Sequence, residues 1–158
     1  MHVDELPSWV CPEARWLIGF NLDHSVTRPA ARRSNWSQRP WRWGSSWSET
    51  KKSLIASQVD RIRHWKIIEG SYEQAPDVEA HWFVDPPYDN AAGRNYRYHD
   101  IDYAALAEWC KSRRGFVQVC ENDGATWLPF EPFGVVPSHR PRGYSREATF
   151  VIDNRHLK

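Results

Sequence analysis

The tetrapeptide Asp85-Pro86-Pro87-Tyr88 constrains this chain more than any other stretch, because it ends the short apolar run of residues 81–84. Proline has no backbone N–H to give to a sheet ladder and its ring fixes φ, so two consecutive prolines end a strand and direct the chain away from it. An acid and an aromatic side chain are thereby held at the carboxyl end of a strand, where open α/β sheets bind ligands. We interpret the tetrapeptide as a functional site; the competing interpretation is a rigid turn with no further role.

The bulk composition excludes several classes of protein. The 158 residues carry 21 basic and 20 acidic side chains, so no overall positive field attracts nucleic acid and any basic surface must be local. No apolar run approaches the roughly 18 residues of a membrane span, and the N-terminus lacks a signal-peptide pattern. The three cysteines lack a Cys-x-x-Cys spacing and the histidines lack ligand spacing, which indicates neither a disulfide framework nor a metal site. We expect a cytoplasmic protein without a metal or a membrane partner.

Residues 1–48 form the first predicted region. Pro12 and the apolar stripe that follows it predict a short helix over residues 13–22. Residues 28–48 then interleave arginine with tryptophan and contain no acid. Guanidinium groups bind phosphate and indoles stack on unpaired bases, so this stretch is a candidate DNA-binding surface. The alternative is a small tryptophan core with guanidinium groups over the indole faces. The arginines assigned to DNA are Arg32, Arg33, Arg39 and Arg42.

Residues 49–158 form the second predicted region, which is α/β. Ser48 is placed to cap a helix that runs to residue 63, and residues 65–69 and 80–84 follow as strands. Asp100 or Asp102 caps a helix to about residue 113, and residues 116–120 form a third strand. Residues 134–136 and 148–153 form two closing strands. The sequence therefore predicts parallel strands with an antiparallel C-terminal hairpin.

Two segments near the tetrapeptide supply further candidate residues. Residues 89–99 form a long polar and aromatic loop directly after it, and such loops are more often functional than idle. Two polar residues also end the third strand on the same sheet edge, where they line a pocket or, in the competing interpretation, cap a helix. The candidate substrate-binding residues are Pro87, Asn90, Arg94, Tyr96, Glu121 and Asn122.

The tetrapeptide resembles motif IV of amino-group DNA methyltransferases, (Asp/Asn/Ser)-Pro-Pro-(Tyr/Phe/Trp), whose Asp form is typical of N6-adenine enzymes. The runs VDPPYDNAAGRNYR and LAEWCKSRRGFVQVCENDGATWLPF resemble the phage and bacterial adenine methyltransferases of the D12 type. The resemblance covers roughly half of the chain. It implies part of a class I, Rossmann-like fold, S-adenosyl-L-methionine as cofactor, double-stranded DNA as substrate, and the cytoplasm of a bacterial host cell as location.

The resemblance also implies roles for individual residues. Asp85 and the carbonyl of Pro86 accept the two hydrogens of adenine N6 and stabilise the positive charge that develops on methyl transfer. Tyr88 stacks on an adenine flipped out of the duplex. Tyr72 keeps the aromatic that follows the motif III strand and is a candidate cofactor contact. Ser71 replaces the acid that usually precedes this aromatic.

One part of the family pattern is missing. The family binds its cofactor on a glycine-rich turn, where a Cβ would block the approach of the backbone, but all eight glycines of this chain are isolated. Motif I is therefore absent. We expect a catalytic subunit completed by a second chain or by self-association, or a fragment of a methyltransferase, acting in defence or in phage self-protection. The alternatives are a catalytically inactive DNA-binding remnant, and methylation of another planar nitrogen such as a glutamine side chain.

Overall fold

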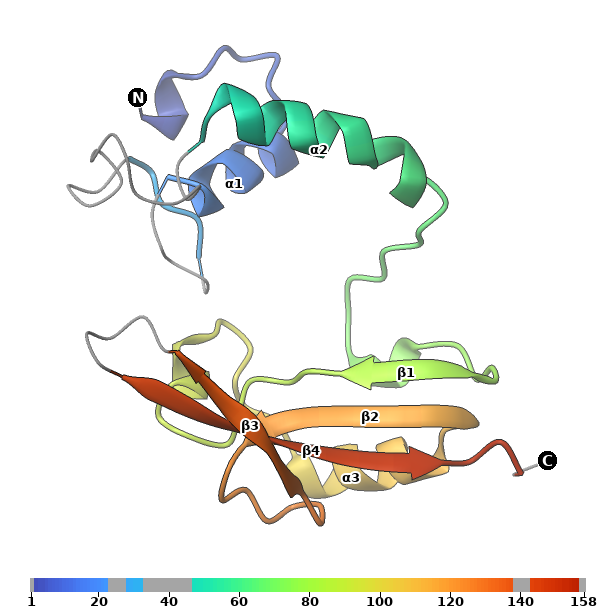
Figure 1. Cartoon of the computed structure of the whole chain (residues 1–158). Helices are drawn as coiled ribbons and strands as arrows, with labels where there is room; N and C mark the ends of the chain where they lie inside the picture. Colours follow the sequence, from blue (N-terminus) through green and yellow to red (C-terminus); the bar gives the residue numbers. More distant parts are fainter. Residues whose placement is uncertain (1, 23–27, 33–46, 138–142, 157–158) are drawn as a thin grey trace. The chain divides into compact units, whose positions relative to one another are not determined.

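The computed structural model describes residues 2–22, 28–32, 47–137 and 143–156, and the chain divides into two compact units, Met1–Ile67 and Ile68–Lys158 (Figure 1). This division falls later in the chain than the change in composition near residue 48. The helix predicted after Ser48 therefore belongs to the first unit.

The described part of the first unit contains a 3-10 helix, η1 (Val3–Glu5), and two α-helices, α1 (Pro12–Phe20) and α2 (Glu49–Ile62). Pro12 occupies the first turn of α1, and the Ser48 hydroxyl caps α2 by accepting a hydrogen bond from the Lys51 N–H. Both predicted helices are confirmed. The Arg15 guanidinium ties η1 to α1 by donating hydrogen bonds to backbone carbonyls, which include that of Val3 at 2.9 Å.

The strand predicted at residues 65–69 is wrong. These residues have no regular structure, and Ile67 is 86% exposed. A strand needs a ladder partner, and a parallel connection normally takes a dozen or more residues. Residues 70–79, which would connect this strand to the next one, are fewer than that. They contain a 3-10 helix, η2 (Tyr72–Gln74), and Pro76. Residues 65–69 therefore have an apolar composition without a sheet to join.

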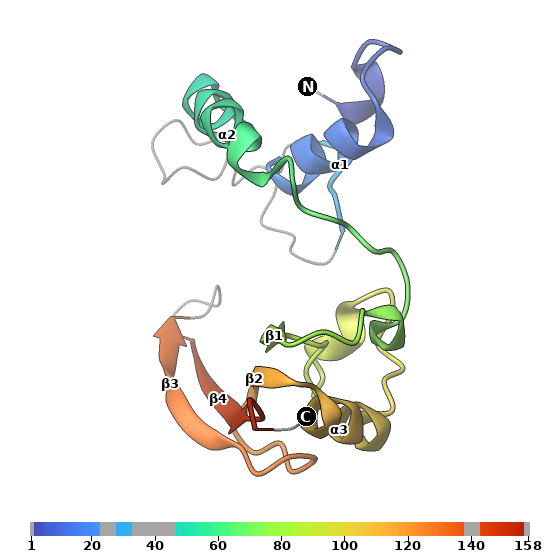
Figure 2. The same cartoon turned by 90° about the vertical axis from the view of Figure 1, so that its right-hand side faces the viewer.

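The second unit is α/β, as predicted, and contains a four-stranded mixed sheet (Figures 1 and 2). Its elements are β1 (Ala80–Val84), α3 (Tyr103–Ser112), β2 (Gly115–Asn122), β3 (Glu131–Pro137) and β4 (Tyr144–Asp153). The strand order is β1-β2-β4-β3; β1 and β2 are parallel, and the other two pairs are antiparallel. β1, which precedes the tetrapeptide, is therefore an edge strand.

The core of the second unit lies between α3 and one face of the sheet. Residues of β2 alternate between buried and half-buried, so every second side chain of this strand faces α3. Three aromatic rings extend the core toward β1, because Trp109 makes edge-to-face contacts with both Trp82 and Tyr72. The fully or nearly buried members of the core are Leu106, Ala107, Cys110, Val117, Val119 and Leu128.

The turn from α3 into β2 depends on two residues. Gly115 has a φ of +100°, and a Cβ built on it lies 2.1 Å from the Ala80 carbonyl oxygen, so only glycine fits there. The buried side chain of Asn154 donates hydrogen bonds to the carbonyls of Lys111 and Arg113 at the end of α3. These contacts fix the start of β2, and the parallel ladder from Gly115 to Val119 then fixes β1.

Candidate active site

The backbone of β1 places Asp85 directly beyond the last ladder pair, Val84 with Val119. The Asp85 carboxylate accepts no hydrogen bond from the residues that the structure describes, so its oxygens are available as acceptors. Partial burial, and then the nearby Glu147 carboxylate, raise the pKa of Asp85 above its usual value. The sequence-predicted catalytic acid therefore lies at the sheet edge with free lone pairs.

Tyr88 is held at both ends. Its hydroxyl donates a hydrogen bond to the Glu147 carboxylate at 2.9 Å, and its backbone carbonyl accepts one from the Asn90 N–H at 2.7 Å. Burial and the Glu147 contact raise the pKa of Tyr88, so the phenol remains a protonated donor at neutral pH. Glu147 lies on β4, opposite Asn122 of β2 and Gly134 of β3.

The loop after Tyr88 folds back onto it. A Cβ built on Gly93 lies 1.9 Å from the Tyr88 carbonyl oxygen, and Gly93 itself is buried. The Asn90 side-chain oxygen accepts hydrogen bonds from the N–H groups of Ala92 and Gly93 at 2.8 and 3.0 Å. Asn90, predicted to bind substrate, therefore shapes the loop, and Gly93 allows a close backbone approach.

Two further contacts fix the residues around the prolines. The Tyr103 hydroxyl, from the first turn of α3, donates a hydrogen bond to the Pro87 carbonyl at 2.6 Å. The Glu121 carboxylate accepts hydrogen bonds from the Asp89 N–H at 3.1 Å and from the Trp127 indole N–H at 3.0 Å. The carbonyl of Pro86 accepts no hydrogen bond within the described part of the chain, so it is a free acceptor beside Asp85.

Glu121 and Asn122 are in β2, so the interpretation of either as a helix cap is wrong. Glu121 is fully buried and also accepts a hydrogen bond from the Asn122 N–H, so its carboxylate positions the chain around Asp89. Asn122 is half-buried, and its side chain donates a hydrogen bond to the Asp123 carbonyl.

An apolar pocket of about 460 Å³ lies beside the tetrapeptide. It brings Tyr72, the predicted cofactor residue, together with two of the predicted catalytic residues, Asp85 and Pro86, but the third, Tyr88, does not line it. Tyr72 also lines an adjacent pocket of about 510 Å³ with the acids Glu69, Asp100 and Asp102. Aromatic walls suit a planar ring, and the adjoining acids suit hydroxyl or cationic groups. The aromatic and motif residues that line the first pocket include Tyr72, Trp82, Asp85, Pro86, Pro87, Tyr98 and Trp109.

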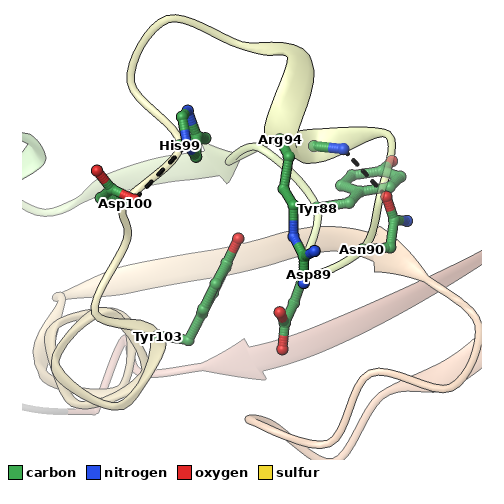
Figure 3. Close-up of a pocket in the computed structure, with 8 residues that line it drawn as sticks. Tyr88, Asp89, Asn90, Arg94, His99, Asp100 and Tyr103 are labelled. Atoms are coloured by element: carbon green, nitrogen blue, oxygen red, sulfur yellow. Dashed lines mark hydrogen bonds and ion pairs between the residues drawn. The ribbon is translucent and has the colours of Figure 1, made fainter.

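A smaller polar pocket of about 220 Å³ is lined by Tyr88 and by residues of the loop that follows it (Figure 3). Three predicted site residues, Tyr88, Asn90 and Arg94, line it with Tyr103, and Figure 3 shows the Arg94 side chain extending from the loop toward Asp89. Tyr96 is 41% exposed and lines neither this pocket nor the two described above.

Most of the predicted DNA-binding arginines lie outside the described residues. These are Arg33, Arg39 and Arg42, whereas Arg32 is exposed and forms an isolated backbone bridge with His2. Across the described ranges, no group of three or more His, Cys, Asp or Glu side chains is placed to hold a metal ion. Across the same ranges, no helix is long and apolar enough to cross a membrane.

Two residues of the site, Glu147 and Tyr103, are not indicated as such by the sequence. The sequence pattern places Tyr103 only on the buried face of its helix, and Glu147 falls just before the predicted closing strand because the apolar residues of β4 begin at Ala148. β4 in fact begins at Tyr144, so Glu147 lies within the strand. Continuing the predicted strand one residue before Ala148, in the same alternation of side chains between the two faces, would have included it. The contact with Tyr88 still joins residues 59 positions apart, which no local pattern indicates.

Comparison with known proteins adds no assignment to these observations. No protein-family model, no curated protein and no solved structure matches this chain.

Proposed function

We propose that this chain is an adenine-N6 DNA methyltransferase, or the catalytic subunit of one, built on part of a class I Rossmann-like fold. The observation that carries the proposal is the position of Asp85-Pro86-Pro87-Tyr88 at the carboxyl end of β1, with Asp85 and Tyr72 lining one pocket. The sequence resemblance supplies the reaction, and the free acceptors at Asp85 and Pro86 are consistent with it.

The proposed mechanism starts from the weak nucleophilicity of adenine N6, whose lone pair is delocalised into the ring. The Asp85 carboxylate and the Pro86 carbonyl each accept a hydrogen bond from one of the two N6–H groups. These hydrogen bonds draw the nitrogen toward tetrahedral geometry and stabilise its developing positive charge. Tyr88 provides an aromatic face for the flipped base. S-Adenosyl-L-methionine, when bound, would supply the methyl group to N6 and leave as S-adenosylhomocysteine, and the methylated nitrogen would then lose one of its hydrogens as a proton to solvent. No covalent intermediate on the protein is needed.

The residues of this chain fit part of that cofactor. Tyr72 and the tryptophans beside it offer an aromatic wall to an adenine ring, but the sequence has no glycine-rich turn to approach the rest of the molecule. A second chain or a second copy therefore completes the cofactor site in this proposal. The edge position of β1 supports it, because an edge strand leaves one side of its backbone open to another strand.

A second candidate function is DNA binding without catalysis, as a methyltransferase remnant. The absence of motif I and the Arg/Trp composition of residues 28–48 favour it. We prefer the enzyme because a remnant has no need of the intact tetrapeptide with its two free acceptors.

The test is transfer of labelled methyl from S-adenosyl-L-methionine to unmethylated double-stranded DNA by the purified chain, with the labelled base identified. We expect label on adenine N6, and a loss of about 10²- to 10³-fold in Asp85→Ala, because one stabilising acceptor is removed. Asp77→Ala is the matched control, since Asp77 is an exposed acid that precedes β1.

Other outcomes discriminate among the alternatives. Full transfer by Asp85→Ala would contradict the role of Asp85. DNA binding without transfer would favour the remnant or an enzyme that lacks its second chain. Label on a protein glutamine would indicate a different planar nitrogen as the acceptor.

A further inference from the structure

The longest-range contact at the tetrapeptide comes from the last strand of the sheet. Glu147 on β4 accepts the hydrogen bond of the Tyr88 hydroxyl at 2.9 Å, although β2 lies between β4 and β1. The ladder partners of Glu147, Asn122 and Gly134, place its backbone in the interior of the antiparallel sheet. The acceptor is therefore carried by a paired strand and not by a loop.

Stacking on a base requires the aromatic ring to keep one plane. The Tyr88 backbone is already fixed by the tight approach of Gly93 and by the Asn90 N–H. A tyrosine has only two side-chain torsions. The phenol oxygen lies on the χ2 axis, so fixing its position sets χ1. Conjugation keeps the O–H bond close to the plane of the ring, so the direction of the Glu147 acceptor also favours one ring plane. Within the described residues, Glu147 is the one hydrogen-bond partner of that oxygen.

Glu147 is suited to this task by its charge and its position. A hydrogen bond to an ionised acceptor is shorter and stronger than one between neutral groups, and the half-buried position of Glu147 limits competition from water. The nearby groups are Asp85 and the thiol of Cys120, neither of which donates a hydrogen bond to it in the structure. Tyr88 is therefore its partner.

We propose that Glu147 is a positioning residue for Tyr88, which sets the ring plane on which the flipped base stacks. This inference rests on the proposed function, because it assigns the stacking to DNA recognition. It predicts that binding of DNA depends on β4, whereas binding of the methyl donor does not.

The first measurement reports the contact itself and needs no activity. In the full chain labelled with ¹³C at the tyrosine ring, the Tyr88 signal is assigned by its disappearance in Tyr88→Phe. We expect this signal to shift in Glu147→Ala and to stay close to its original position in Glu147→Gln, whose amide oxygen still accepts. Glu131→Ala, an exposed acid on neighbouring β3, is the matched control and leaves the signal unchanged.

The second measurement reports the function. We expect the KM for DNA to rise about tenfold in Glu147→Ala and in Tyr88→Phe, with the KM for S-adenosyl-L-methionine unchanged and with near-normal values in Glu147→Gln. Because both residues act through one contact, the double variant should be no worse than either single variant.

The outcomes separate the inference from the proposed function. A Tyr88 signal that does not move in Glu147→Ala, or additive effects in the double variant, would overturn the positioning role. A signal that moves while the wild-type chain neither transfers methyl nor binds DNA would overturn the proposed function and still support the positioning of Tyr88. If Glu147→Ala does not fold, Glu147→Gln alone tests the inference. A KM for DNA that rises as much in Glu147→Gln as in Tyr88→Phe would overturn it.

Discussion

At the scale of single residues, the most informative feature is the proximity of two carboxylates, Asp85 and Glu147. Burial and the Glu147 charge raise the pKa of Asp85, so the folded chain holds this proton to a higher pH than the unfolded chain does. The carboxyl therefore lowers stability as pH rises through that interval. The ionised Asp85 carboxyl therefore adds nothing to stability at neutral pH, which is compatible with the catalytic role proposed for it.

This pair predicts a shift in the pH dependence of methyl transfer. Transfer should fall on the acid side as Asp85 becomes protonated, because a protonated carboxyl is a weaker acceptor. Glu147→Gln removes the neighbouring negative charge, keeps the acceptor for Tyr88, and should move this acid limb to lower pH. The limb is measured as kcat/KM against pH.

Glu131→Gln is the control for the pH experiment, because Glu131 is exposed and lies on β3. An acid limb that stays in place in Glu147→Gln, or that moves equally in Glu131→Gln, would show that Glu147 does not influence the charge of Asp85.

At the scale of elements, the helices and β1 were predictable because each is delimited by a local signal. Pro12 starts α1, Ser48 and Asp102 cap α2 and α3, and Pro86 ends β1. These signals act within a few residues and do not depend on the rest of the fold.

The failures at this scale have a physical cause. The apolar run at residues 65–69 matches a strand but finds no ladder partner, and apolar composition alone does not supply one. The start of β3 was predicted at residue 134, whereas the strand begins at Glu131. All residues of β3 are exposed, so no alternation of apolar and polar residues marks where it starts. The contacts of Glu147 and Tyr103 with the tetrapeptide depend on sheet order and register, which a single sequence does not specify.

The loop that follows the tetrapeptide gives a prediction about packing. Gly93→Ala puts a Cβ against the Tyr88 carbonyl, so the loop must move away from Tyr88. We expect the free energy of unfolding to fall by about 1–3 kcal/mol, as for other overpacked sites, and methyl transfer to fall markedly. Urea unfolding and the transfer assay measure the two effects.

Gly134→Ala is the matched control for this loop. It lies on β3, no atom lies within 4 Å of its added Cβ, and its φ is not in the left-handed range. Equal effects of the two substitutions would contradict the close approach of Gly93 to Tyr88.

At the scale of the whole molecule, the described site residues from Tyr72 to Glu147 belong to the second unit, and the arginine-rich stretch belongs to the first. In the proposed function the second unit supplies the chemistry and the first supplies phosphate contacts. Each unit then has its own measurable property, since phosphate contacts depend on salt and base stacking depends far less on it.

This division predicts a salt effect. Replacing Arg32, Arg33, Arg39 and Arg42 together by glutamine should weaken DNA binding and flatten the plot of log K against log salt by about 0.9 for each phosphate that is no longer neutralised. Binding is measured by fluorescence anisotropy over a salt series. Arg61→Gln with Arg63→Gln, at the end of α2, is the control, and an unchanged slope in the fourfold variant would contradict the assignment of these arginines to DNA.

The hydrogen bond between Tyr88 and Glu147 also bears on what a premature stop codon would do to a chain of this kind. During translation the tetrapeptide is made 59 residues before the acid that holds its aromatic ring. A nonsense mutation in that interval would leave a reading frame in which the motif is still legible but the strand that carries Glu147 is never synthesised. Under the proposed positioning role, a copy of the motif without an acid on the last strand would hold its aromatic ring less firmly, so the motif alone would not identify a working site.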